Sequence, residues 1–274
     1  MIRLILIALT LFIFAGGSAV CAQTPPRSPK REFFKNILND QKAIWIAPLH
    51  LRRHDAKWVI PSSIGFMALV TTDRMSGDEI AEFDRQLKAS RIISKAGAFY
   101  TLGAVSGTFY LWGRKRKDDR ARETGVLSAE ALINSLIVES ALKGITQRAR
   151  PMARVERSEF FDGGDSFPSG HSTQAWAVAT VIANEYHDRR AVQIAAYGVA
   201  TAVSVARFTS QKHYISDVVA GSALGYAIGK YVYKTHHRKS LDEDKPASTF
   251  WQPVIVPQFN RAAHAYGLSL TWNF

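Results

Sequence analysis

Long apolar runs separated by polar turn signals fill most of the chain, a pattern that favours helices. The runs predict helices over residues 32–40, 58–70, 78–96, 97–112, 126–147, 170–186, 190–206 and 215–234. No comparable set of alternating apolar and polar positions, as strands would require, occurs before residue 250. The body of the chain is therefore expected to be all-α.

The two ends of the chain have other patterns. Residues 1–22 combine Arg3, an apolar run over 4–15 and small residues up to Ala22, which is typical of a secretory signal peptide cleaved after Ala22. An uncleaved membrane anchor is the alternative, but the apolar run is shorter than the ~20 residues of a span. At the other end, WQPVIVPQF and AYGLSLTWNF flank an Asn260-Arg261 turn and predict a short β-hairpin-like tail.

These patterns divide the chain into four parts. We expect a signal peptide over 1–22, a linker and N-terminal helical region over 23–94, a helical core over 95–240 and a C-terminal tail over 241–274. The chain is thus predicted to be exported to the periplasm or cell envelope. Its one cysteine, Cys21, would be lost on cleavage, which excludes a disulfide framework and a cysteine-based metal site.

Two interpretations of the apolar runs stay open. Residues 97–113 and 191–206 lack charges but are shorter than a typical span, and the mean hydropathy of −0.08 is low for a protein with several spans, so a soluble or peripheral domain is favoured. The basic loops 114–122, 187–190 and 234–239 would nevertheless share one side of a membrane if the runs did cross it. The formal net charge of +12 indicates anionic partners, such as phosphates, anionic lipid headgroups or nucleic acid, and does not choose among them.

Three stretches carry residues suited to phosphate chemistry. In KGITQRARP, Lys143 and Arg150 are seven positions apart, which on a helix would place both cations on one face. In PSGH, Ser169 is a residue type that begins helices and Gly170 lets a ligand approach the backbone, so the helix that follows would point its free N–H groups at an anion.

The third stretch, ARFTSQKHYISDVVAG, places Arg207 six residues before His213 and Asp217 four residues after it. A carboxylate one helical turn from an imidazole can accept a hydrogen bond from one ring nitrogen, which leaves the other nitrogen free as a nucleophile or base. Arg207 adds a guanidinium that can bind phosphate through two nitrogens.

Taken in order, these stretches resemble the type 2 phosphatidic acid phosphatase (PAP2) superfamily through K-x6-R-P, P-S-G-H and R-x5-H-x3-D. The family includes class A acid phosphatases, membrane lipid phosphatases and vanadium haloperoxidases. The match covers residues 143–217 directly and is plausible for about 95–235. One departure is Ala206, because the family usually has Ser directly before the third-motif Arg.

The resemblance implies an all-α, PAP2-type helical bundle and a hydrolase acting on phosphoric esters. It implies that His213 attacks phosphorus to form a phosphohistidine, that Asp217 orients His213, and that His171 protonates the leaving oxygen and then activates water. It further implies that the phosphate is bound by the cations and by the start of the following helix: Lys143, Arg150, Ser169, Gly170 and Arg207. No metal and no cofactor are expected.

The predicted function is therefore metal-independent hydrolysis of phosphomonoesters or of lipid phosphates and diphosphates. A vanadium-dependent haloperoxidase is one alternative, although the family's haloperoxidases are usually much longer chains. A non-catalytic envelope phospholipid-binding protein is another, but simple binding would not require His171, His213 and Asp217. The expected partners are a phosphorylated small molecule or lipid, with membrane-surface contact open and no nucleic acid. Asp162 and Asp165 are interpreted as turn caps, and His187, His236 and His237 as surface residues.

Overall fold

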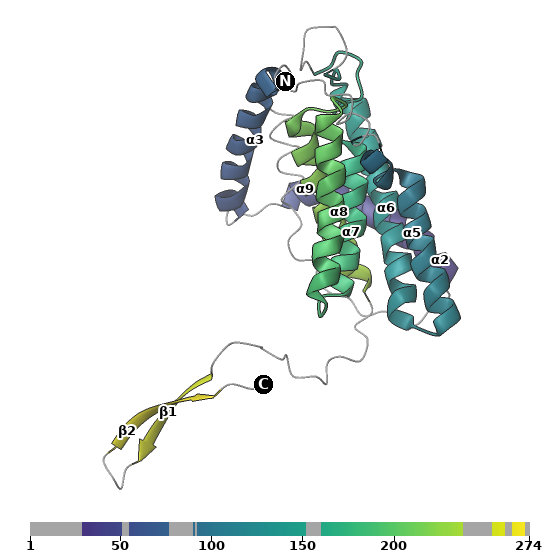
Figure 1. Cartoon of the computed structure of the whole chain (residues 1–274). Helices are drawn as coiled ribbons and strands as arrows, with labels where there is room; N and C mark the ends of the chain where they lie inside the picture. The colour runs from purple at the N-terminus through teal and green to yellow at the C-terminus, as the bar shows by residue number, and fades with distance from the viewer. Residues whose placement is uncertain are drawn as a thin grey trace. The chain divides into compact units, whose positions relative to one another are not determined.

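The structure of the protein is a computed structural model that describes residues 29–50, 55–76, 90, 92–151, 160–237, 254–260 and 265–271. The chain forms two compact units, Met1–His237 and Arg238–Phe274. The described part of the first unit is helical, which confirms the predicted all-α body (Figure 1). Its elements are α2 (Pro29–Ile46), the 3-10 turn η1 (Ala47–His50), α3 (Ala56–Ser76), α5 (Phe99–Arg116), α6 (Asp119–Thr146), α7 (Gly170–Glu185), α8 (Arg190–Thr209) and α9 (Ile215–His236).

In the second unit, β1 (Val254–Asn260) and β2 (Ala265–Thr271) pair antiparallel, with Asn260 opposite Ala265. The predicted signal peptide over 1–22 lies outside the described residues, as does most of the predicted helix 78–96.

Helix α6 begins seven residues before the predicted start at 126, because Asp118 caps it by accepting a hydrogen bond from the backbone N–H of Ala121 at 3.1 Å. The polar residues 119–125 gave no apolar pattern from which this first part could be predicted.

Helix α7 lies at the centre of the first unit and packs against α9, α8 and α6 (Figure 1). Two apolar clusters surround it. One joins α7 to α6 and α9 and includes Val138, Phe167, Val181 and Leu224, and the other joins α7 to α5 and α8 and includes Leu102, Val178 and Val203. The polar ends of these helices are thereby held in a fixed arrangement by a common core.

Three glycines one turn apart on α9 let it approach α7 closely. A Cβ atom on Gly225 would lie 2.1 Å from the carbonyl oxygen of Thr173, and Gly221 and Gly229 meet the α7 region in the same way. The backbone contact continues to the ends of the helices, where the N–H of Ser169 donates to the carbonyl oxygen of Asp217 at 3.0 Å. The glycines therefore bring the second and third motifs into direct contact.

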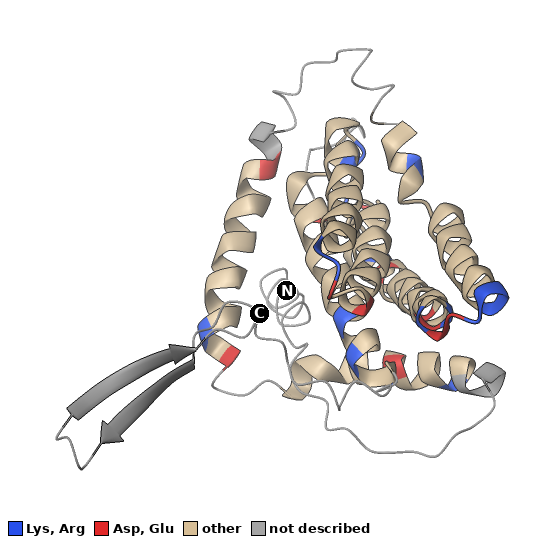
Figure 2. Cartoon of the chain, turned by 60° about the horizontal axis from the view of Figure 1, so that its bottom comes forward, with Lys and Arg blue, Asp and Glu red and all other residues tan. Residues whose placement is uncertain are grey.

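Two of the described helices, α6 and α8, are long and apolar enough to cross a membrane, judged by length and composition. Of the most apolar part of each, 61% is buried inside the protein in α6 and 22% in α8. Charged residues gather near helix ends and turns, while the middles of the helices are mostly uncharged (Figure 2). A core helix of a soluble protein passes the same test, so the preference for a soluble or peripheral domain stays a prediction.

Candidate active site

The residues predicted from the three motifs come together where α6 and α8 end and α7 and α9 begin. A cavity of about 560 Å³ at this place is lined by four of them, together with Ser94, Lys95 and Lys212 among others. The four are Lys143, Gly170, His171 and Arg207. Of the others, Ser169, His213 and Asp217 are buried behind the cavity and Arg150 is part-exposed.

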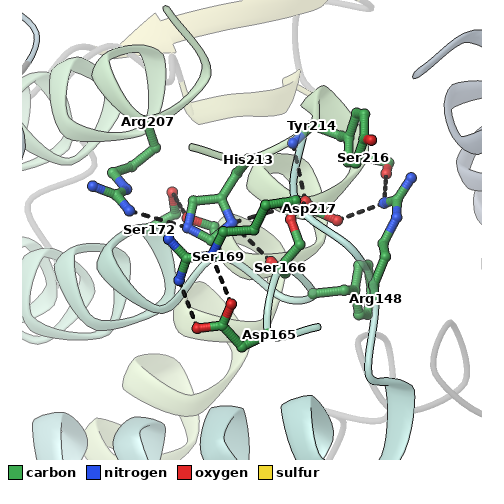
Figure 3. A network of polar contacts seen from close by, with 12 residues as sticks. Arg148, Asp165, Ser166, Ser169, Ser172, Arg207, His213, Tyr214, Ser216 and Asp217 are labelled. Atoms are coloured by element: carbon green, nitrogen blue, oxygen red, sulfur yellow. Dashed lines mark hydrogen bonds and ion pairs between the residues drawn. The ribbon is translucent and has the colours of Figure 1, made fainter. Parts of the chain in front are cut away.

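His213 is held in one tautomer by its two neighbours (Figure 3). Its Nδ1 lies 2.7 Å from the carbonyl oxygen of Ser166, which can only accept, so Nδ1 carries the proton. Its Nε2 lies 3.2 Å from Nη2 of Arg207, which can only donate, so Nε2 presents a lone pair. Burial lowers the pKa of His213, which keeps the imidazole neutral. The lone pair of Nε2 therefore accepts a hydrogen bond from a guanidinium.

The sequence-based prediction for Asp217 needs a correction. Its Oδ2 lies 3.8 Å from Nδ1 of His213, too far for a hydrogen bond, because His213 precedes α9 and the two are not one helical turn apart on a helix. Asp217 instead accepts from Ser166 Oγ at 2.6 Å and from the backbone N–H of Tyr214 at 3.0 Å. Ser166 thus connects the two residues, because its hydroxyl donates to Asp217 and its carbonyl oxygen accepts from the imidazole of His213.

Arg148 is a member of the site that the sequence analysis missed. Its side chain is fully buried, and it donates through Nη1 to Asp217 at 2.5 Å and through Nη2 to Asp73 at 2.7 Å. Its guanidinium also lies over the rings of Phe160 and Tyr214. Asp73 in turn caps α9, because it accepts from the backbone N–H of Ser216 at 3.2 Å and from its hydroxyl.

The three cations of the motifs have different surroundings. Arg207 donates to Ser94 at 2.9 Å, and its buried Nε has no hydrogen-bond partner within the described part of the chain. Burial and then the charge of Arg150 lower the pKa of Arg207 to about 10. Lys143 is paired with Glu139 at 3.0 Å. Arg207 is thus the guanidinium with unused hydrogen-bonding capacity at the cavity.

Arg150 does not share a helix face with Lys143, contrary to the prediction. Helix α6 ends at Thr146, where Gln147 takes a left-handed conformation (φ 44°), so Arg150 lies in the segment after the helix. There it binds both oxygens of Asp165 at 2.6 Å. Asp165, interpreted from the sequence as a turn cap, is therefore the partner of Arg150, and this contact lowers the pKa of Asp165.

The start of α7 forms as expected at Ser169, although no backbone N–H of the helix bonds to the Ser169 side chain. The Ser169 hydroxyl instead accepts from Ser172 at 3.1 Å. At Gly170 an added Cβ would lie 2.5 Å from the carboxylate of Glu139, so a carboxylate stands directly against the first residue of α7. Burial raises the pKa of Glu139, and Lys143 opposes this.

His171 lines the cavity from the first turn of α7. Burial, followed by the positive charge of Arg207, lowers its pKa to about 4. Lys143 and Arg150 lower the pKa of His171 in the same direction, as does any positive charge that His213 takes up. The site therefore carries an excess of positive potential, which an anion would offset.

The residues that could hold a metal ion lie elsewhere. Among the described residues, a group of three ligands forms from Glu123, Glu185 and His237 at the far ends of α6, α7 and α9. The two carboxylates raise the pKa of His237 to about 9, and His236 pairs with Asp40 at 2.7 Å. The prediction that His236 and His237 are surface residues is thus wrong, whereas His187 is exposed as expected.

Comparison with known proteins finds phosphatases and one phosphatase family. Residues 124–241 match the model of the PAP2 superfamily. A 70-residue stretch is 37% identical to lipid A 1-phosphatase of Porphyromonas gingivalis and covers 25% of this chain and 16% of that protein. A crystal structure titled as the first transmembrane PAP2-type phosphatidylglycerolphosphate phosphatase, from Bacillus subtilis, overlaps 74% of this chain and 94% of its own with a TM-score of 0.46 and 21% identity. The match over residues 124–241 agrees with the resemblance carried by the three motifs.

Proposed function

We propose that the protein is a metal-independent phosphatase that works through a phosphohistidine on His213. The observation that carries the proposal is the tautomer of His213, whose Nε2 lone pair lies 3.2 Å from Arg207 beside the cavity. A nucleophilic nitrogen must be unprotonated, and phosphoryl transfer needs cations around the transferred group. His213 supplies the nucleophilic nitrogen, and Arg207 supplies a cation beside it.

The phosphate would bind between Arg207, Lys143 and the first turn of α7. Arg207 has an unused buried Nε, and the N-terminal end of a helix favours negative charge. Glu139 stands against Gly170, so the phosphate must share Lys143 with it or displace it. The burial that raises the pKa of Glu139 favours its neutral form and thus reduces this competition. Arg150 and Ser169 complete the predicted set of phosphate-binding residues.

The chemistry proceeds in two displacements. Nε2 of His213 forms a bond to phosphorus while the bond from phosphorus to the leaving oxygen breaks, and His171 gives that oxygen a proton. His171 then takes a proton from water, the water oxygen attacks phosphorus, and the phosphorus–nitrogen bond breaks to restore His213. A bound phosphate dianion raises the pKa of His171 and so supplies the protonated form that the first step needs. Asp217 stabilises the charged imidazole through the Ser166 loop.

A lipid phosphate is the substrate class that we favour over soluble phosphomonoesters. Phe99 and Tyr100 line the cavity with exposed fractions of 44% and 69%, so an apolar substrate portion has a surface to contact. The similar stretch in a protein named lipid A 1-phosphatase supports the same class. Export to the periplasm or envelope, with a core over 95–240, belongs to this proposal, and α8 with its exposed apolar residues favours contact with a membrane surface.

Release of inorganic phosphate by the full-length chain tests the proposal. The substrates are p-nitrophenyl phosphate and detergent-dispersed phosphatidic acid, with EDTA present, and the variants are His213→Gln and His171→Gln. His187→Gln is the matched control, because His187 is an exposed histidine outside the site. We expect release by the wild type and the control, a loss of at least about 10³-fold in His213→Gln, and a phosphorylated histidine after quenching in alkali. Equal activity of wild type and His213→Gln would contradict the proposed nucleophile.

A further inference from the structure

Three ligand-type side chains meet at the end of the helical bundle opposite the candidate active site. Glu123 lies in the first turns of α6, Glu185 is the last residue of α7, and His237 follows the last residue of α9. Because α7 has 16 residues, its two ends are about 24 Å apart. This group is therefore separate from the phosphate chemistry described above.

The distances within the group match those between ligands of one metal ion. Nδ1 of His237 lies 3.1 Å from Oε2 of Glu185 and 3.4 Å from Oε1 of Glu123, and all three ligand atoms lie within 4.8 Å of one another. Zinc binds nitrogen and oxygen at about 2.0–2.1 Å in a tetrahedron, so neighbouring ligand atoms are about 3.3–3.4 Å apart. The two measured separations lie close to this edge length.

Two of the three ligand atoms, those of Glu185 and His237, are buried without a hydrogen bond within the described part of the chain. Glu185 is only 4% exposed, and among the described residues neither its Oε2 nor Nδ1 of His237 has a hydrogen-bond partner, although the two atoms lie within ion-pair distance. Buried polar atoms are almost always hydrogen-bonded. A cation between the carboxylates and the imidazole would satisfy both atoms at once.

The surroundings hold the ligands in place. The ring of Tyr233 stacks on His237 with centroids 4.5 Å apart, and the backbone N–H of His237 donates to the carbonyl oxygen of Tyr233 at 2.9 Å. Arg120 donates to the backbone carbonyl of Glu185 at 3.0 Å and also binds Asp188, which fixes the end of α7. Supporting contacts of this kind orient the ligands of metal sites.

We propose that Glu123, Glu185 and His237 bind one Zn²⁺ ion, with water as the fourth ligand. Two carboxylates balance the double charge of the ion. Glu123 and His237 are 17% and 29% exposed, which leaves room for the water. The ion links the start of α6, the end of α7 and the end of α9, and its role is structural, as in sites where binding free energy adds to folding free energy.

The zinc content of the purified full-length chain tests the proposal, measured by mass spectrometry of the metal before and after dialysis against EDTA. We expect about one zinc per chain, its loss on dialysis, and its return with added Zn²⁺. At a free Zn²⁺ concentration about 100 times Kd, the Tm should rise by roughly 5–10 °C. Co²⁺ in place of Zn²⁺ should give the strong visible absorption of a tetrahedral site.

Two ligand variants and a control make the outcome decisive. Glu185→Gln and His237→Gln should each lose the metal and the Tm response, and either one suffices if the other does not fold. Asp119→Asn, which changes an exposed carboxylate in the first turn of α6, should keep both. Absence of zinc together with no Tm response would overturn the proposal and leave a protonated His237 as the counter-charge. Equal zinc affinity in Glu185→Gln would overturn it too. Phosphatase activity enters none of these readouts.

Discussion

Nη2 of Arg148 binds the carboxylate of Asp73 at 2.7 Å, and neither side chain has any exposed surface. The pair joins α3 to the segment after α6, although 74 residues separate the two in the chain. Since Arg148 also binds Asp217, a helix outside the three motifs is connected to the candidate catalytic residues. Arg148 is thus a cation that the two buried carboxylates share.

We predict that Arg148→Met lowers the free energy of unfolding by about 3–5 kcal/mol. The substitution removes the cation from two buried carboxylates, and an uncompensated buried charge is more costly than the loss of the contact itself. Urea denaturation followed by circular dichroism measures the change. A loss below about 1 kcal/mol would mean that the carboxylates are already neutral in the native protein.

Asp73→Asn is predicted to slow catalysis without weakening substrate binding. The amide keeps the shape of the carboxylate, so Arg148 is left to act on Asp217 alone, and Asp217 then stabilises the charged imidazole of His213 less. We expect kcat to fall by about tenfold, or about 1.4 kcal/mol, at unchanged KM. Asp188→Asn, in the exposed pair with Arg120, is the matched control. A change in KM alone would argue against this role.

Much of the fold and site could be predicted from the chain, but only where local signals coincide with the tertiary arrangement. Helices α7 and α9 begin where the pattern predicts, at Gly170 and Ile215, because apolar runs and their flanking turns are local properties. The position of Arg150 was mistaken, because the seven-residue helical spacing from Lys143 was carried past the end of the helix, where Gln147 takes a left-handed conformation. Asp73 carries no local signal at all, because its partners lie far away in the sequence.

The close contact between α7 and α9 is predicted to depend on Gly225. In Gly225→Ala the new methyl group would meet the carbonyl oxygen of Thr173, so the helices must separate at a cost of about 1–3 kcal/mol or more. Gly198→Ala is the control, because its added Cβ on α8 would have no atom of another described element within 4 Å, and alanine favours a helix by up to about 1 kcal/mol. Thermal unfolding compares the two. Equal stability of both variants would contradict a tightly packed α7–α9 contact.

Asp165→Asn is predicted to strengthen the binding of inorganic phosphate and vanadate. Asp165 holds both donor groups of Arg150 at 2.6 Å and thus competes with an anionic ligand. Because the Asp165 side chain is 62% exposed, the gain should be small, about twofold to fivefold in the inhibition constant. Competitive inhibition of phosphate release measures it, with Asp162→Asn as an exposed control in the same loop. A weaker inhibition would show that Asp165 positions Arg150 for the ligand instead.

His171 is predicted to make stability depend on pH in a window between about 4 and 6.5. The folded protein holds the pKa of His171 at about 4, below its ordinary value of 6.5, so the unfolded chain binds more protons in this window and stability falls as the pH falls. Below about pH 4 both states are protonated and the loss is complete. Bound phosphate supplies negative charge, raises the pKa of His171 and reduces the loss.

Urea midpoints of the wild type and His171→Gln across this pH range measure the contribution of His171, because the other titrating groups are common to both proteins. We expect the wild type to lose more stability than His171→Gln between pH 6.5 and 4, and saturating phosphate to narrow the difference. Parallel pH profiles would mean that His171 is not held neutral by burial and by the cations around it. In that case His171 would titrate near its ordinary pKa in the free protein, and a fraction of it would carry the proton that the proposed first step requires without bound phosphate.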